Sequence, residues 1–240
     1  MEGFSYSDIF ATKGIEYLVI IAFLALLIPF SIILNKQVKI TRQLQKALGI
    51  LSAKILKIPQ GLFYSRNHTW MFMERSGAAT VGLDDLLLHI TGEVKFTTLK
   101  KPGDMISKGE LLTEIDQNGK LLSIVSPVSG KIIDTNAMLH EHPGVLNEDP
   151  YGKGWIYKIK PTNWIAEVKS CYFAEEASIW SENELVRFKD FLATTMRNYS
   201  PDASMVVLQD GGELADHSLA SMPDECWKDF QKEFLNLYRV

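Results

Sequence analysis

Between residues 69 and 134 the sequence is a series of short runs of β-forming residues, and turn-forming dipeptides punctuate the series. Such a pattern is typical of a small antiparallel sandwich or barrel. The predicted strands are Thr69–Met73, Ala78–Leu83, Val94–Thr98, Leu111–Ile115, Leu121–Val125 and Gly130–Asp134. The turn signals are Ser76-Gly77, Pro102-Gly103, Asn118-Gly119 and Ser129-Gly130. A helix-like piece over residues 84–90 interrupts the series, so the fold is expected to be mainly β with some α.

The N-terminal part of the chain contains a long apolar run. Residues Ile15 to Leu34 are nearly all apolar, and Glu16 is the only charged residue among them. At about 1.5 Å per residue, a helix of this length covers roughly 30 Å, the thickness of a bilayer's hydrocarbon core. We therefore expect an N-terminal transmembrane helix. A cleaved signal peptide is less favoured because Lys36 follows the run in place of a small-residue cleavage site. A buried core helix is also less favoured, because the run has no polar face.

Basic residues flank this run on one side. Lysines and an arginine are concentrated within about twenty residues after it, at Lys36, Lys39, Arg42, Lys46, Lys54 and Lys57. Because cytoplasmic flanks carry an excess of positive charge, this pattern predicts a single-pass membrane protein whose C-terminal domain is cytoplasmic.

The remaining segments predict four regions. Residues 1–35 hold the N-terminal segment and the span, and residues 36–60 a juxtamembrane helix and linker, with a leucine-rich stripe that lies either on anionic lipid or against protein. Residues 61–162 form the β-sandwich. Residues 163–240 form a C-terminal α/β extension. In it a capping box at Ser181 starts a helix, residues 204–208 form a short strand, and Ser221 with Pro223 opens a last helix.

Composition and motifs exclude several classes of function. A formal net charge of −4 provides no basic field for nucleic acid, and Cys171 and Cys226 form no CxxC pair. The sequence has no GxGxxG, P-loop, HExxH or GxSxG motif. His140-Glu-His142 could bind a metal, but an exposed loop is the favoured interpretation, and no metal site is predicted. Asp84-Asp85 with the nearby His89 is interpreted as a helix start.

Within residues 61–162, a set of landmarks resembles the H protein of the glycine cleavage system in order and spacing. These landmarks are Tyr64, His68-Thr-Trp70, Ala79-Thr-Val-Gly82, Gly92-Glu-Val, Pro102-Gly-Asp104, Lys108-Gly-Glu110, Ser126-Pro-Val-Ser-Gly130 and Asn147-Glu-Asp-Pro-Tyr-Gly152. The resemblance implies a lipoyl-domain-like β-sandwich (barrel-sandwich hybrid). It also implies a protein that shuttles groups on a lipoyl arm between partner enzymes.

In that family the arm is attached to a lysine eight positions before the proline of the Pro-Val-Ser-Gly motif. Eight positions before Pro127 stands Gly119, and the nearest lysine is Lys120. Asn118-Gly119 predicts a type I′ turn with both residues at the tip, because both tolerate positive φ. Lys120 then begins the returning strand, where a one-residue shift changes the face on which a side chain emerges. It is either a solvated hairpin lysine or a lipoyl-lysine in a shifted register.

Two functions remain from this reading. The first is a membrane-anchored, H-protein-like subunit without lipoate, which acts as a docking or scaffold module of a membrane-associated assembly. The second is a lipoyl carrier that uses Lys120 to shuttle an aminomethyl group or reducing equivalents. In either case the protein is carrier-like and not an enzyme. An enzyme would need a site around residues such as His140, His142 and Asp149.

The expected partners are proteins, either membrane-associated or cytoplasmic redox enzymes, together with membrane lipid and without nucleic acid. No cofactor is expected, and lipoate on Lys120 is the alternative.

Overall fold

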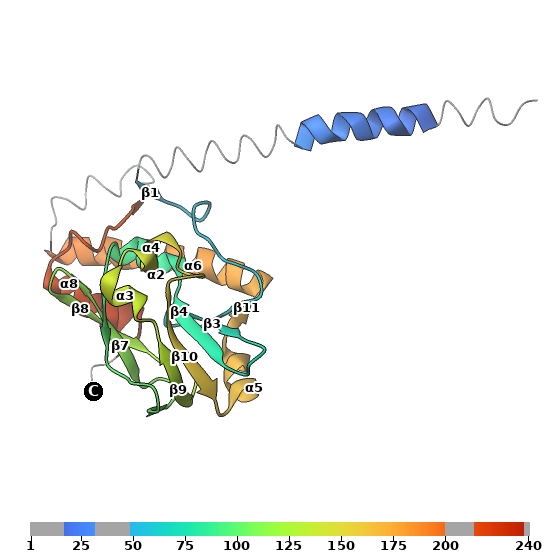
Figure 1. Ribbon diagram of the computed structural model, residues 1–240. Coiled ribbons are helices and arrows are strands. Elements are labelled where there is room, and N and C mark those ends of the chain that lie inside the picture. The colour runs from blue at the N-terminus through green and yellow to red at the C-terminus, as the bar shows by residue number, and fades with distance from the viewer. Residues whose placement is uncertain (1–16, 32–48, 200–213, 238–240) are drawn as a thin grey trace, which may run out of the picture. The chain divides into compact units, whose positions relative to one another are not determined.

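The computed structural model describes residues 17–31, 49–199 and 214–237. The chain divides into two compact units, Met1–Leu48 and Gly49–Val240. All the elements labelled below belong to the second unit (Figure 1).

In the first unit the structure describes one helix, over residues 17–31, and all of its side chains are exposed. A helix of this length rises about 22 Å, which is less than the roughly 30 Å of a hydrocarbon core. Across the three described ranges, no helix combines the length and apolar character needed to cross a membrane. This finding contradicts the predicted N-terminal transmembrane helix, and with it the single-pass topology, the membrane localisation and the cytoplasmic orientation. The length of the apolar run had suggested a longer helix, and its two ends lie outside the described residues.

The predicted juxtamembrane helix is only partly described, because residues 32–48 lie outside the described ranges. The part that follows is not helical. Ile50–Leu51 forms strand β1, which pairs antiparallel with β12, Leu214–Ala215. Leu51 and Leu214 are both buried, so this part of the leucine stripe packs on the C-terminal extension.

Two antiparallel sheets build the β-sandwich, and each of the six predicted strands is present with ends within two residues of the prediction. The larger sheet has seven strands in the order β11-β2-β3-β4-β10-β9-β6. Their bounds are Tyr172–Phe173, Phe63–Tyr64, Thr69–Met73, Ala79–Leu83, Trp155–Pro161, Gly130–Thr135 and Met105–Ile106. The smaller sheet has three strands, β5-β7-β8, with the bounds Lys95–Thr98, Leu111–Gln117 and Lys120–Val125.

One hydrophobic core joins the two sheets to helix α2, Asp85–Thr91. Asp84 caps this helix because its side chain accepts a hydrogen bond from the backbone N–H of Leu87 at 2.8 Å. The helix-like piece predicted over residues 84–90 is therefore confirmed. Short helical turns connect the later strands: α3 (Met138–Glu141), α4 (Val145–Glu148), α5 (Trp164–Glu167) and the 3₁₀ turn Val168–Ser170.

The C-terminal extension packs on the sandwich through α6, Glu175–Tyr199, and through α8, Asp224–Asp229, which continues as a π-helical turn over Phe230–Phe234. Phe188, Phe191, Phe230 and Phe234 form a cluster of stacked and edge-on rings. The helix α6 begins at Glu175, so the predicted start at Ser181 is wrong. Ser181 is instead buried inside the helix. The predicted strand over residues 204–208 lies outside the described residues.

Candidate functional site

The hairpin of β7 and β8 contains the position at which a carrier of this type would hold its arm. Gln117 pairs with Lys120, so Asn118 and Gly119 form the turn, with φ values of 55° and 90°. The backbone N–H of Gly119 also donates to the Asp116 carboxylate at 2.7 Å. Two consecutive residues with positive φ are the mark of a type I′ turn, which confirms the predicted tip.

Lys120 does not extend into solvent. Its Nζ donates hydrogen bonds to the carbonyl oxygens of Ala220 at 2.9 Å and Met222 at 2.6 Å. The same ammonium lies 5.9 Å from the centre of the Trp227 ring, within the range of a cation–π contact. The half-buried Lys120 side chain therefore joins the hairpin to the loop that precedes α8.

Further contacts hold the extension against β8. The side-chain oxygen of Gln231 accepts a hydrogen bond from the backbone N–H of Ser123 at 3.0 Å. The buried Trp227 donates from its indole nitrogen to the Leu219 carbonyl at 2.9 Å, which fixes the loop that binds Lys120. The carbonyl oxygens of Ala220 and Met222 bind the Lys120 ammonium as they would bind a cation. The amine therefore makes tertiary contacts.

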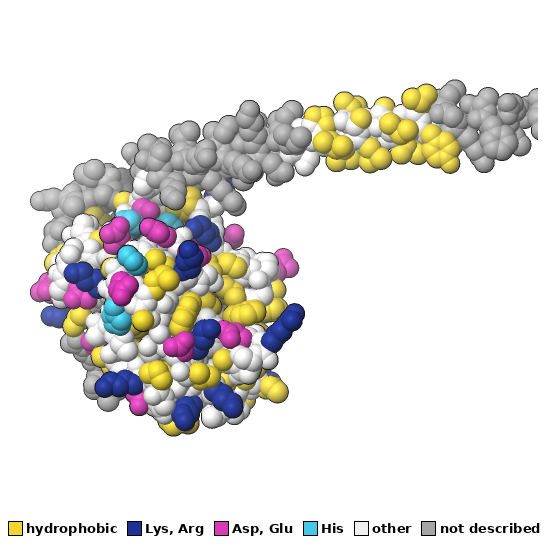
Figure 2. Space-filling model, in the orientation of Figure 1, with side chains coloured by type: hydrophobic (Ala, Val, Ile, Leu, Met, Phe, Trp, Pro, Cys, Tyr) yellow, Lys and Arg dark blue, Asp and Glu magenta, His cyan; other side chains and the backbone are white. Residues whose placement is uncertain are grey.

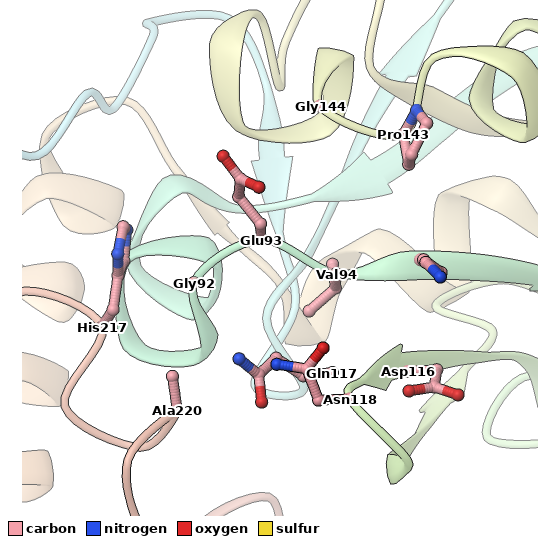
Figure 3. Close-up of a pocket in the computed structure, with 11 residues that line it drawn as sticks. Gly92, Glu93, Val94, Asp116, Gln117, Asn118, Pro143, Gly144, His217 and Ala220 are labelled. Atoms are coloured by element: carbon pink, nitrogen blue, oxygen red, sulfur yellow. The ribbon is translucent and has the colours of Figure 1, made fainter.

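A cavity of about 380 Å³ lies beside the hairpin tip (Figure 3). Four parts of the unit line it: the end of the β7–β8 hairpin, the segment after α2, the turn between α3 and α4, and the loop between β12 and α8. The lining residues are Gly92, Glu93, Val94, Lys95, Asp116, Gln117, Asn118, Pro143, Gly144, His217 and Ala220. Lys120 is absent from this lining, and its ammonium is bound by the same loop between β12 and α8.

Comparison with known proteins identifies the family of the chain. The family model described as glycine cleavage H-protein matches residues 62–184, about half of the chain. The chain belongs to the glycine cleavage H-protein family.

Two curated relatives illustrate the similarity. The probable glycine cleavage system H protein of Thermococcus kodakarensis is 36% identical over 119 residues, which are 50% of this chain and 88% of the relative. The glycine cleavage system H protein of Psychrobacter cryohalolentis is 34% identical over 128 residues, which are 53% of this chain and 98% of the relative. A solved structure, the glycine cleavage system H protein from Mycobacterium marinum, has 28% identity and a TM-score of 0.41 and covers 44% of this chain and 87% of its own. Family membership confirms the prediction of a carrier-type protein that is not an enzyme.

In this H-protein family member, the landmark residues of the sandwich have structural roles. The indole of Trp70 donates to the Pro150 carbonyl at 3.1 Å, and Gly82 allows the ring to lie against the backbone, because a Cβ at that position would be 2.6 Å from it. His68 is fully buried, and its Nδ1 is 2.8 Å from Asp84 Oδ2. Its Nε2 lies 3.6 Å from Glu184 of α6, too far for a hydrogen bond but close enough for an ion pair.

The environment of His68 favours its charged form. Burial alone would lower the pKa of His68, but the negative charge of Asp84 and the hydrogen bond to it outweigh burial and raise this pKa to about 9. Arg187 pairs with Glu184 and lies over the Phe234 ring, 3.9 Å from its centre. The buried His68 and the partly exposed Glu184 and Arg187 thus connect a family landmark to α6 and to the turn at Phe234.

The histidine pattern of the H-protein-like chain does not form the metal site that its spacing could suggest. His140 and His142 are exposed, and His140 Nε2 is 2.7 Å from the Thr98 hydroxyl. Asp149 accepts hydrogen bonds from the backbone N–H groups of Gly152 and Lys153, and so shapes a turn. These residues do not form the catalytic cluster considered from the sequence. The cysteines Cys171 and Cys226 are both free.

The structure brings together another set of residues that sequence reasoning separated. His89 Nδ1 lies 2.8 Å from Asp216 Oδ1, and His217 Nε2 lies 3.7 Å from the same oxygen. Burial lowers the pKa of His89, but hydrogen bonds to Asp216 and Asp85 more than compensate and raise it to about 9. The Asp-His dipeptide at residues 216–217 was the available signal, but only the fold shows that it meets α2.

A lipoyl arm does not fit the hairpin of this family member as it lies. The tip holds an amide side chain and a glycine, and the amine of Lys120 is bound to two carbonyl oxygens. An amide at that amine would lose the positive charge and most of the hydrogen-bond donors that the two carbonyls now use.

Proposed function

We propose that this H-protein family member is not lipoylated and acts as a docking or scaffold module for protein partners. The observation that carries the proposal is the engagement of the Lys120 ammonium by the carbonyl oxygens of Ala220 and Met222. The sandwich keeps the landmarks of the family, so a surface that partner proteins recognise can persist without the arm. The enzymes of glycine cleavage are the first partners to test, because the curated relatives are glycine cleavage system H proteins.

The chemistry of attachment supports this proposal. A lipoyl-attaching enzyme must reach a neutral amine that projects from the turn. Lys120 lies immediately after the turn, and its amine donates hydrogen bonds to two carbonyl oxygens, which the single N–H of a lipoyl amide could not both satisfy. Modification would require the loop before α8 to leave β8, together with the contacts of Trp227 and Gln231.

The alternative function is a lipoyl carrier that uses Lys120. Two observations favour it: the chain belongs to a family of carriers, and Lys120 is adjacent to the position that the family pattern assigns to the modified lysine. In this function the loop before α8 would have to release the amine before each modification.

The test is lipoylation of the purified full chain by a lipoate-attaching enzyme in the presence of lipoate and ATP, followed by intact-mass and peptide-mass analysis. We expect the wild-type chain to remain unmodified. Gly119→Lys is the matched positive control, because it puts an amine at the tip, where a Cβ meets no atom within 4 Å. Its positive φ costs roughly 1 kcal/mol, which a folded domain tolerates. A lipoyl adduct on the wild-type peptide that contains Lys120 would establish the carrier alternative.

The docking role has a separate test. The full chain is immobilised, and its binding to purified glycine cleavage enzymes from the same cell is measured with and without prior treatment by the lipoate-attaching enzyme. We expect saturable binding that does not depend on that treatment. Absence of binding to any of these enzymes would remove them as partners, and binding only after lipoylation would support the carrier instead.

A further inference from the structure

The residues His89, Asp216 and His217 offer three metal-ligand atoms that all lie within 4.8 Å of one another. With ligand bonds of about 2.0–2.2 Å, the ligand atoms of a tetrahedral zinc site lie roughly 3.4 Å apart. The distances of 2.8 Å from His89 Nδ1 and 3.7 Å from His217 Nε2 to Asp216 Oδ1 lie on either side of this value. Two of the three ligand-atom distances are therefore close to the value that one ion requires, and all three ligand atoms lie within 4.8 Å of one another.

The backbone that carries these ligands is fixed in advance. The N–H of His217 donates to the carbonyl of His89 at 2.7 Å, and the N–H of Leu219 donates to the carbonyl of Ile90 at 3.1 Å. Asp216 donates its N–H to the Gly49 carbonyl at 2.6 Å. The loop after β12 therefore binds the last turn of α2 through its main chain, independently of the side chains, and a metal would not have to organise the fold around itself.

The surroundings of His89 match those of a metal-ligating histidine. Its second ring nitrogen, Nε2, lies 3.5 Å from Asp85 Oδ2, and this carboxylate oxygen is itself held at 2.7 Å by the backbone N–H of Lys57. A carboxylate behind the non-ligating nitrogen orients the ring and strengthens it as a ligand. Two carboxylates, Asp85 and Asp216, would also balance the two positive charges of the ion.

The site can be reached from solvent. The His217 side chain is 49% exposed, and those of His89 and Asp216 are each 20% exposed. His217 stands next to Gly92 at the edge of the cavity described above (Figure 3). On the face shown in Figure 2, histidine side chains gather among acidic ones. With three protein ligands, a fourth position remains for water.

We propose that His89 Nδ1, Asp216 and His217 Nε2 bind a divalent transition metal of the zinc class, with Asp85 as the carboxylate that orients His89. Two imidazoles and one carboxylate are the donor set that zinc accepts in sites with an open position. This inference is independent of the proposed docking function, because it concerns neither Lys120 nor lipoylation.

The test is titration of the chelator-treated full chain with Zn²⁺ alone, followed by calorimetry and by metal analysis after equilibrium dialysis. We expect one zinc per wild-type chain. His217→Ala should weaken binding at least tenfold, and because this side chain is half exposed and its backbone contacts remain, the variant should fold. Asp85→Asn should weaken binding by about 10- to 100-fold through the loss of the orienting carboxylate. His142→Ala, from the exposed histidine pattern, is the matched control and should bind like the wild type.

X-ray absorption at the zinc edge checks the identity of the ligands. We expect a first shell of nitrogen and oxygen at about 2.0–2.1 Å. A scatterer at about 2.3 Å would place the metal on Cys171 or Cys226 and overturn the assignment. It would equally be overturned if the wild type took up no stoichiometric zinc, or if the folded His217→Ala variant, checked by circular dichroism, bound zinc as tightly as the wild type.

Discussion

The ammonium of Lys120 donates a hydrogen bond of 2.6 Å to the carbonyl oxygen of Met222, which is 102 positions further along the chain. Together with the bond to Ala220, this contact joins the start of β8 to the loop before α8. The lysine next to the position that the family pattern assigns to the modified residue thus makes a long-range tertiary contact. Its removal should therefore affect stability directly.

Lys120→Ala should lower the free energy of unfolding by about 1–2 kcal/mol. The reason is that two partly buried carbonyl oxygens would lose a charged donor, and hydrogen bonds to charged groups contribute more than neutral ones. Urea denaturation of the full chain measures the change. Lys131→Ala, at an exposed position on β9, is the control and should stay within about 0.5 kcal/mol of the wild type. Equal effects of the two substitutions would contradict a stabilising role of the Lys120 contact.

The reactivity of single lysines gives an independent measurement. At limiting amounts of an amine-acetylating reagent, Lys120 should be labelled at least several-fold more slowly than Lys131 in the same molecule, because only an amine released from its carbonyl partners can react. Peptide mass spectrometry at short times reads both sites. Similar labelling rates for the two lysines would show that the Lys120 amine is free in solution.

Gly130→Ala should destabilise the sandwich by roughly 2–3 kcal/mol. Gly130 starts β9 beside the end of β10, and a Cβ there would collide with the Lys160 carbonyl oxygen, which is backbone and cannot move aside cheaply. Gly144→Ala is the matched control, because its φ is −58° and a Cβ meets nothing within 4 Å. That variant should be neutral or up to about 1 kcal/mol more stable. Thermal unfolding of both variants distinguishes the two cases.

The buried pair of His68 and Asp84 should make stability depend on pH. The folded state raises the pKa of His68 to about 9 from an ordinary value of 6.5. Between these two pH values His68 keeps its proton in the folded protein and loses it in the unfolded chain. The resulting stabilisation, roughly 3 kcal/mol, is fully present below pH 6.5 and is lost as the pH rises through about 9. Urea unfolding at pH 6.5, 7.5 and 8.5 should show stability falling with pH.

His68→Gln provides the check on this assignment. At pH 6.5 the free energy of unfolding of this variant should be lower than that of the wild type. Between pH 6.5 and 8.5 this free energy should fall less steeply than in the wild type, by the slope that corresponds to about one proton. His89, whose pKa is also raised to about 9, remains in this variant and maintains part of the slope. An unchanged slope in His68→Gln would mean that His68 does not titrate in this range.

Local patterns predicted most of the sandwich. The strand Thr69–Met73 follows from a run of β-forming residues, and the turn at Asn118-Gly119 follows from residues that tolerate positive φ; both are determined by neighbours in sequence. The apolar run at the N-terminus led to the wrong prediction of a transmembrane helix, because the described helix is shorter than the run. The helix α6 starts earlier than its capping pattern indicates, because Ser181 is buried against the core, where tertiary packing overrides a local cap.

The candidate sites depend on contacts between distant segments, which local patterns do not contain. The position of Lys120 in the sequence gives its place after the turn, but not the two carbonyls that bind its amine. Likewise, His89 and Asp216 are each unremarkable in their own segments, and only the pairing of β1 with β12 and the loop that follows bring them together.

The pairing of Ile50 with Ala215 also determines when β1 can fold during synthesis of the chain. Ile50 leaves the ribosome long before its partner has been translated, and at roughly 5–20 residues per second the delay is about ten to thirty seconds. During that interval the partner strand of β1 has not been synthesised, and the part of the core that buries Leu51 is incomplete. The first strand of this unit is therefore among the last to find its place, and the nascent chain depends on its own final segment to finish folding.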